Sequence, residues 1–262
     1  MDMPINRLKQ GLRAGSPQIG LWSSLASYVT VEVVAGSGFD WLLLDTEHAP
    51  NELQMLHHQL QAAERGTASA VVRPAWNDTV VIKRLLDLGV QTLLVPMVQN
   101  AEEAARAVAA TRYPPHGVRG LGTVTRANDY GRVKDYLDRC HEELCIVVQL
   151  ETRVALDNLE SIAAVDGVDG LFVGPSDLSA DMGHLGNSAH PDVRRVIDDA
   201  ISRIVKSGKF AGILTPDEAY ARHCIKLGAT FVAVGSDSGL LARQSEALAA
   251  RFAPAKGSRA EV

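Results

Sequence analysis

Short apolar runs alternate with longer amphipathic stretches along almost the whole chain. The runs have the length and bounds typical of buried strands, and the stretches between them repeat their apolar residues at helical spacing. This strict alternation is the pattern of βα units around a parallel sheet. The predicted strands are Gln18–Trp22, Trp41–Leu44, Ala70–Arg73, Thr92–Val95, Cys145–Leu150, Gly170–Val173, Ala211–Leu214 and Phe231–Val234.

The intervening stretches predict helices that return the chain to the next strand. Three of them are followed by Gly89, Gly208 and Gly228, where a left-handed residue that ends a helix is easiest for glycine. The alternative is that these are ordinary loop glycines. The helices that we predict include Asn51–Arg65, Thr79–Leu88, Ala101–Thr111, Val133–His141, Asp192–Ser207 and Pro216–Lys226.

Eight strands in alternation with helices favour a closed (β/α)₈ TIM barrel over an open doubly wound sheet, which usually has fewer. The length of 262 residues fits one such barrel as a single domain, which we place at residues 1–252. We expect residues 253–262 to be a disordered tail. A long segment at 113–130, with Pro114-Pro115, predicts a lid or contact surface, the alternative being a solvated excursion.

Composition narrows the possible partners. The chain is 46% apolar and carries a net charge of −5, with its basic residues scattered, so we expect no nucleic-acid partner. No apolar run has the length of a signal peptide core or a bilayer span, which predicts a cytoplasmic protein without membrane contact. The three cysteines, Cys140, Cys145 and Cys224, lack metal or redox spacing, so we interpret them as reduced packing residues.

In such a barrel the chemistry lies at the carboxyl ends of the strands. Glu151 and Asp177 follow adjacent predicted strands, and two converging carboxylates form an ordinary site for Mg²⁺ or Mn²⁺. The alternative is that both acids cap helices. A closed zinc site is not expected, because the cysteine and histidine pairs are missing. The polar residues at the strand ends are Asp45–His48, Arg73, Gln149–Glu151 and Gly174–Asp177.

Three further residues are considered for a catalytic or substrate-binding role, each with an alternative interpretation. His48, beside Glu47, is a candidate general acid or base, although one of eight histidines can lie at the rim without a role. Arg73 is placed to stabilise an oxyanion or grip a carboxylate, or else to pair with a rim acid. Asp87, in a predicted helix, is by sequence alone a solvated acid.

Other chemistries find less support. None of the lysines follows a predicted strand, so a Schiff base is not expected. The glycines of 117–122 follow a helix and not a strand, so they fail the context of a nucleotide loop. The segment 235–239 follows the last strand, where barrels often bind phosphate, but Asp237 would repel it. If this segment does bind phosphate, the alternative function is a metal-free isomerase that acts on a phosphorylated substrate.

Taken together, the motifs resemble the class II pyruvate aldolases of the HpcH/HpaI family over almost the whole chain. The resemblance is specific for the family but not for the substrate. The stretches that carry it are Pro17–Trp22, Gly38–Trp41, Asp45–Pro50, Val72–Pro74, Gln91–Gln99, Arg112–Pro115 with Gly117 and Arg119-Gly120, Gln149–Thr152 and Val173–Ser179.

The resemblance implies roles for individual residues. Glu151 and Asp177 would ligate a divalent metal ion, Mn²⁺, Mg²⁺ or Co²⁺. Arg73 would contact the keto oxygen of pyruvate, and His48 would pair with Asp87 to transfer protons through a water. The reaction would be the reversible cleavage of 4-hydroxy-2-oxo acids such as 4-hydroxy-2-oxoheptanedioate to pyruvate and an aldehyde, here succinate semialdehyde. The substrate contacts that we predict are Trp22, Arg73, Gln149, Ser176, Asp177 and Leu214.

The resemblance also implies a homohexamer, a trimer of dimers, in which the last helix packs on a neighbouring subunit. The apolar side of that helix, predicted at 240–252, would equally cover its own barrel. Some positions differ from the residues that the resemblance leads us to expect, namely Ser23, Ser24, Thr46 and 123–125. They leave the identity of the natural aldehyde open. An aldolase for sugar-derived acids is the alternative within the family, and a non-catalytic metabolite-binding barrel is the least favoured one.

Overall fold

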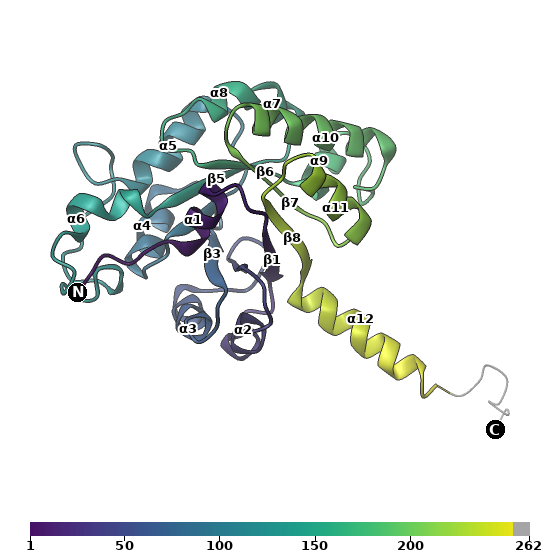
Figure 1. Cartoon of the computed structure of the whole chain (residues 1–262), viewed down its shortest axis with the longest axis horizontal. Coiled ribbons are helices and arrows are strands. Elements are labelled where there is room, and N and C mark those ends of the chain that lie inside the picture. The colour runs from purple at the N-terminus through teal and green to yellow at the C-terminus, as the bar shows by residue number, and fades with distance from the viewer. Residues whose placement is uncertain (254–262) are drawn as a thin grey trace.

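A computed structural model, in which residues 1–253 are described, forms a closed barrel of eight parallel strands in sequence order, surrounded by helices (Figure 1). The predicted barrel is confirmed, and the strand bounds differ from the prediction by two residues at most. All but the first residue of the predicted tail lies outside the described residues. The strands are β1 (Gln18–Ser23), β2 (Trp41–Asp45), β3 (Ser69–Arg73), β4 (Thr92–Val95), β5 (Cys145–Leu150), β6 (Gly170–Val173), β7 (Phe210–Leu214) and β8 (Phe231–Ser236).

Helices follow the strands as predicted, except in the stretch at 133–141. The stretch at 133–141, predicted as one helix, forms only two short helical turns. The prediction that glycines in a left-handed conformation follow three helices is confirmed, with φ of 89° at Gly89, 78° at Gly208 and 105° at Gly228. The helices are α1 (Arg7–Arg13), α2 (Tyr28–Ala35), α3 (Leu53–Ala63), α4 (Thr79–Asp87), α5 (Ala101–Thr111), α6 (Tyr136–Arg139), α7 (Arg153–Asp157), α8 (Leu159–Ala163), α9 (Pro175–Asp181), α10 (Pro191–Lys206), α11 (Glu218–Lys226) and α12 (Asp237–Ala250), with 3₁₀ turns η1 (Arg126–Asn128) and η2 (Cys140–Glu142).

The barrel interior is filled by aromatic rings. The ring of Trp41 stacks on that of Phe231 with centroids 4.1 Å apart, and Phe172 contacts both Phe231 and Trp22. Two leucines of α1 belong to the same buried cluster, so this helix closes the amino-terminal end of the barrel. A second and larger core lies between the outer faces of the strands and the helices. A barrel filled in this way is a rigid frame for side chains at its opposite end.

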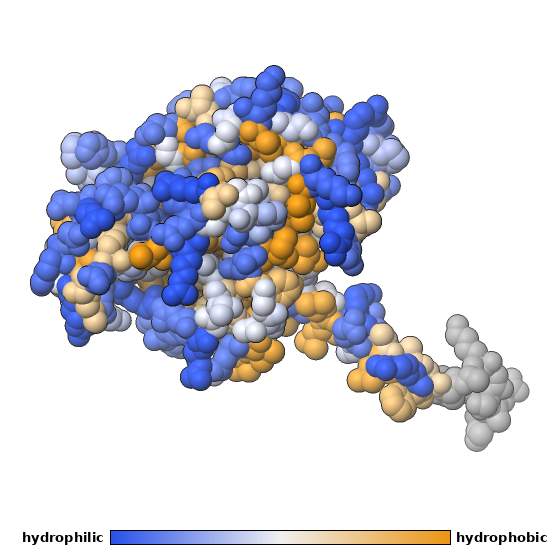
Figure 2. All heavy atoms as spheres, in the orientation of Figure 1, coloured by the Kyte–Doolittle hydropathy of each residue, from blue (hydrophilic) through white to orange (hydrophobic). Residues whose placement is uncertain are grey.

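The last helix departs from this compact arrangement. In Figure 1, α12 leaves β8 and projects away from the barrel, and Figure 2 shows apolar side chains on it. Of its described residues only Asp237 is buried, while Leu241 is 62% exposed and Phe252, just beyond it, is 81% exposed. The apolar side of α12 therefore does not cover its own barrel. Within the described part of the chain, no helix has the length and apolarity needed to cross a membrane.

Gly20 makes room for the stacked rings. A Cβ atom at this position would lie 2.1 Å from the Trp41 ring. We predict that Gly20→Ala lowers the free energy of unfolding by roughly 1–3 kcal/mol, because the ring must move in a close-packed interior. Gly36→Ala is the control, since its φ is −97° and no atom lies within 4 Å of the added Cβ. Denaturant unfolding of both variants measures the difference, and equal stabilities would refute the packing argument.

Candidate active site

Asp45 and Arg73 form a buried ion pair at the carboxyl ends of β2 and β3. Nε and Nη2 of Arg73 donate to the two carboxylate oxygens of Asp45 at 2.9 and 2.6 Å. The indole N–H of Trp22 donates to the same carboxylate at 3.2 Å, and the guanidinium lies 5.0 Å from the Trp22 ring centroid. Burial acts to raise the pKa of Asp45, but the hydrogen bond and charge of Arg73 hold it below its usual value. Both groups are therefore ionised, and the two hydrogen bonds fix the orientation of the guanidinium.

Glu47 and His48 continue from this pair onto the rim. Nη1 of Arg73 lies 3.0 Å from Oε2 of Glu47, so the predicted alternative for Arg73, a salt bridge to a rim acid, is present. Asp45 also accepts the backbone N–H of Glu47 at 3.0 Å, which shapes the turn. The His48 side chain is 65% exposed, and its Nε2 lies 3.9 Å from Oε1 of Glu47. The histidine is thus accessible to substrate and solvent.

Glu151 is held by two hydrogen bonds at the end of β5. The backbone N–H of Met97 donates to Oε1 at 2.8 Å, and the side-chain amide of Gln149 donates to Oε2 at 2.6 Å. Met97 has a φ of 54°, a left-handed conformation that is uncommon for a residue with a side chain. Such strained backbone is often found at functional sites. Here it directs an amide at a buried carboxylate, a feature that our sequence analysis missed.

Gly174 lets the sixth strand approach Glu151. A Cβ at Gly174 would lie 2.7 Å from Oε2 of Glu151 and 2.9 Å from Nε2 of Gln149. Beyond it, Ser176 and Asp177 are exposed in the first turn of α9. The interpretation of both acids as helix caps is wrong, because the residues at the N-cap positions of α7 and α9 are Thr152 and Gly174. The close approach of glycine to acid was also missed.

The carboxylates near this point repel one another. Burial raises the pKa of Glu151 to about 7, and the charges of Asp177 and Glu47 add to the shift although the Met97 amide opposes it. Burial likewise raises the pKa of Glu47, against the charges of Arg73 and His48. Oε1 of Gln149 is buried without a partner among the described residues. Carboxylate and amide oxygens are the donors that a hard divalent cation prefers, and such an ion would relieve the repulsion.

Asp87 is not the solvated acid that the sequence alone suggested. It ends α4 and accepts a hydrogen bond from Nη2 of Arg119 at 2.9 Å. The Arg119 side chain is fully buried, lies over the Tyr113 ring, and comes from the long 113–130 segment. Among the described residues, His48 and Asp87 share no hydrogen bond. A single chain therefore does not bring together the pair that the resemblance implies.

Trp22 and Leu214, predicted as substrate contacts, differ in position. Trp22 is buried beneath Arg73, whereas Leu214 ends β7, is partly exposed, and packs against the cluster inside the barrel. Ser23 and Ser24, considered for the aldehyde pocket, donate hydrogen bonds to Asp237. The hydroxyl of Ser23 is therefore already engaged.

The segment 235–239, for which phosphate binding was the less favoured alternative, does not form a loop. Strand β8 continues to Ser236, and α12 begins directly after it. The Asp237 carboxylate accepts the N–H groups of Ser24 and Ser238 at 2.9 and 2.7 Å. The Ser236 hydroxyl accepts the N–H of Gly239 at 3.0 Å. A carboxylate of the chain itself thus occupies the place of an anion.

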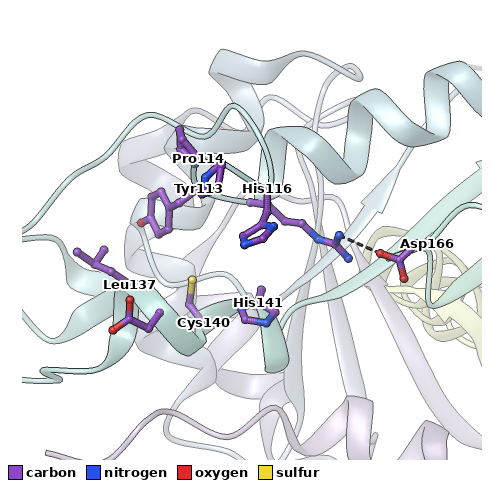
Figure 3. Close-up of a pocket in the computed structure, with 10 residues that line it drawn as sticks. Tyr113, Pro114, His116, Leu137, Cys140, His141 and Asp166 are labelled. Atoms are coloured by element: carbon purple, nitrogen blue, oxygen red, sulfur yellow. Dashed lines mark hydrogen bonds and ion pairs between the residues drawn. The ribbon is translucent and has the colours of Figure 1, made fainter.

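A separate cavity of about 480 Å³ lies far from the rim (Figure 3). It is bordered by the end of α5 and by the segments that lead into β5 and β6, so it opens at the amino-terminal face of the barrel. Arg112 and Asp166 form an ion pair of 3.0 Å at its edge, and Tyr113 and His116 line it. In barrels of this type a chain's own catalytic residues lie at the opposite face.

Fold and site together define a barrel enzyme with interacting acids and a fixed arginine at its carboxyl-terminal rim. The model of the family described as HpcH/HpaI aldolase/citrate lyase matches residues 18–244. The chain belongs to this family and is a carbon–carbon lyase.

Individual relatives are similar over nearly their full length. A protein of Rhizobium etli named pyruvate aldolase is 58% identical over 97% of this chain and 100% of its own. One of Salmonella dublin named 4-hydroxy-2-oxo-heptane-1,7-dioate aldolase is 56% identical over 96% of both chains. The crystal structure of a family member from Burkholderia cenocepacia is similar at a TM-score of 0.91 and 37% identity, over 94% of this chain and 99% of that one.

The raised pKa of Glu151 predicts a pH dependence of stability. Between the ordinary value of 4.5 and about 7, the folded state holds a proton that the unfolded chain has released. The free energy of unfolding should therefore fall with rising pH across this window, by roughly 2–4 kcal/mol relative to Glu151→Gln, which cannot titrate. Denaturant unfolding in EDTA at several pH values measures the difference. A pH-independent difference would place the pKa of Glu151 near its ordinary value.

Proposed function

We propose that this chain is a divalent-metal-dependent, class II aldolase that cleaves 4-hydroxy-2-oxoheptanedioate reversibly to pyruvate and succinate semialdehyde. The names of the relatives at 56–58% identity support the substrate. The observation that carries the reaction class is the buried Glu151, with its pKa raised by burial and by Asp177, at the end of the strand next to β6. An aldolase for sugar-derived 2-keto-3-deoxy acids remains the alternative.

Glu151 and Asp177 are the proposed metal ligands. Their oxygen donors suit Mg²⁺, Mn²⁺ or Co²⁺. When bound, the ion would supply Lewis acidity to the 2-keto oxygen and carboxylate of the substrate. Gln149 helps to orient Glu151 through its hydrogen bond of 2.6 Å. The N–H groups of Ser176 and Asp177 lie in the first turn of α9, where a helix leaves amides without an intrahelical partner, and this supports a role in binding the substrate carboxylate.

Arg73 is proposed to stabilise the negative charge that develops on the keto oxygen. Its contacts with Asp45 and Glu47 use only some of its N–H groups, so it can still donate to substrate. Because these contacts already fix the guanidinium, little reorganisation is needed when the enolate forms. Trp22 beneath it and Leu214 at the end of β7 are proposed to bound the substrate space.

His48 is proposed to remove the proton of the 4-hydroxyl group through a water and to return a proton to the enolate. Its exposure on the rim suits exchange with solvent and substrate. Asp87 is proposed to orient the imidazole in the assembled enzyme, because in one chain it is bound to Arg119. The 113–130 segment, which supplies Arg119, would then border a neighbouring active site and make assembly necessary for activity.

Assembly as a homohexamer, a trimer of dimers, is proposed from the exposed apolar side of α12. The helix projects from the barrel with Leu240, Leu241 and Leu248 exposed, so a neighbouring subunit is the natural place for it to pack (Figure 2). We also propose a cytoplasmic location and small-molecule substrates, with neither nucleic acid nor membrane as a partner.

Removal of the metal should abolish cleavage. We predict that EDTA-treated enzyme releases pyruvate from 4-hydroxy-2-oxoheptanedioate only when Mn²⁺, Mg²⁺ or Co²⁺ is restored. Glu151→Ala should lower kcat/KM by roughly 10²–10³-fold or more, since both the ion and its alignment are lost. Glu102→Ala, an exposed acid on α5, is the matched control. Full turnover in EDTA would overturn the class II mechanism, and turnover of a sugar-derived acid alone would favour the alternative substrate.

Disruption of the apolar side of α12 should dissociate the assembly. We predict that the double variant Leu241→Asp and Leu248→Asp has a lower molar mass in solution than the wild type, because charges would replace exposed leucines at a packed surface. Light scattering after gel filtration measures the mass. Glu246→Gln also changes the charge, but at an exposed residue on the opposite side of the same helix, so it should leave the mass unchanged. A monomeric wild type would refute the proposal.

A further inference from the structure

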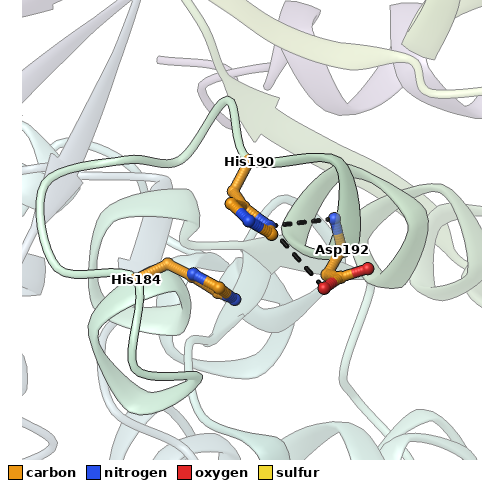
Figure 4. Close-up of side chains that lie close together, drawn as sticks. All are labelled: His184, His190 and Asp192. Carbon is orange, nitrogen blue, oxygen red and sulfur yellow. Dashed lines mark hydrogen bonds and ion pairs between the residues drawn. The ribbon is translucent and has the colours of Figure 1, made fainter.

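His184, His190 and Asp192 form a cluster outside the proposed active site. It lies where the chain passes from the end of α9 to the start of α10, beyond the turn that carries Asp177 (Figure 4). One ligand atom from each of the three side chains lies within 4.8 Å of the other two. The rest of the proposed mechanism makes no use of these residues.

The candidate ligand atoms lie within 4.8 Å of one another, somewhat farther apart than the ligands of a coordinated ion. Nδ1 of His190 lies 3.8 Å from Oδ2 of Asp192, and the two imidazole rings are stacked with centroids 3.7 Å apart. Metal–nitrogen and metal–oxygen bonds of about 2.1 Å put tetrahedral ligands roughly 3.4 Å apart. Small side-chain rotations would therefore bring the three groups around one ion. The ring of His184 is free to turn, because it makes no hydrogen bond to any described residue.

The backbone holds these side chains in place before any ligand binds. The N–H of His184 donates to the carbonyl of Ser179 at 2.7 Å, and the segment closes through turns from Asn187 to His184 and from His190 to Asn187. Gly183 and Gly186 take positive φ, 82° and 75°, which these turns require. The connection is thus a built turn structure, and two histidines from its opposite ends face each other.

We propose that His184, His190 and Asp192 bind a borderline divalent cation, with Zn²⁺ as the best fit. Two imidazoles and one carboxylate are ligands that suit Zn²⁺, Ni²⁺ or Cu²⁺, whereas the oxygen donors of Glu151 and Asp177 suit Mg²⁺ or Mn²⁺. The chain would then carry two sites of different chemical preference on the same side of the barrel. This site does not depend on the proposed function.

Binding exchanges existing contacts for metal bonds. Asp192 now pairs with Arg195, and Nδ1 of His190 accepts the N–H of Asp192 at 3.2 Å as the N-cap of α10. The ion replaces the guanidinium as the cation beside Asp192, so that the carboxylate stays compensated. Because His184 follows α9 and His190 precedes α10, the ion would join the ends of two helices that otherwise meet through a loop.

The test uses Glu151→Gln, which weakens the catalytic site, as the background protein. Equilibrium dialysis with Zn²⁺ should give one bound equivalent at the cluster, and Co²⁺ should give the visible absorption of a low-coordinate ion with nitrogen ligands. Adding His184→Ala should weaken binding by at least roughly 10–100-fold, the loss that even an outer-shell change produces. Adding His141→Ala, an exposed histidine on the opposite face, should leave binding unchanged.

His184→Ala is the informative variant, because the ring of His184 makes no hydrogen bond to a described residue, whereas His190 caps a helix. Asp192→Asn is the second variant, since it keeps the size of the side chain. Equal Zn²⁺ affinity in the background protein and in both variants would overturn the proposal. A Co²⁺ spectrum that is the same in the background protein and in the variants would also overturn it. Neither result bears on pyruvate release, so this test and that of the aldolase activity can fail separately.

Discussion

The buried ion pair of Asp45 and Arg73 is the constraint on which the rest of the site depends. The two residues are register partners at the ends of β2 and β3, so the pairing of these strands places the carboxylate beside the guanidinium. Two charges with so little exposure are tolerated only if their hydrogen-bonding groups are satisfied. Trp22, Glu47 and backbone amides supply that satisfaction, which ties the barrel interior to the rim. A slip of one residue between the strands would separate the charges and turn their side chains to opposite faces.

The charges at the rim are unevenly compensated as a result. Arg73 neutralises Asp45 and part of Glu47, but Glu151 and Asp177 have no cation of the described chain in contact with them. Burial raises the pKa of Glu151, and the negative charges of Asp177 and Glu47 add to that shift. A fixed cation next to such acids is the arrangement on which the proposed binding of a metal ion and an anionic substrate side by side rests. The same barrel thus supplies a rigid positive group and a site that a mobile positive ion can fill.

Much of this could be predicted from the sequence, because burial on both faces leaves a clear signature. The predicted bounds of β4 and β5, Thr92–Val95 and Cys145–Leu150, were correct, because every position of both strands is buried and most are apolar. The stretch at 133–141 was predicted as one helix because its composition suits a helix, but few of its residues are buried. Contacts made by backbone groups could not be predicted from the sequence. An example is the amide of Met97, whose direction depends on a single unusual φ. The partner of Asp87 was missed for a similar reason, because Arg119 lies far away in sequence.

Asp237 gives the outer helix a connection to the substrate end of the barrel. Its carboxylate binds Ser23 and Ser24 at the end of β1, so the direction in which α12 leaves the barrel is set by residues beside the proposed catalytic rim. Any exchange at positions 23 or 24, which we considered for the aldehyde pocket, would also disturb the anchor of that helix. Engineering of acceptor specificity in this scaffold is therefore more restricted at these two serines than at Leu214, where no such anchor exists among the described contacts.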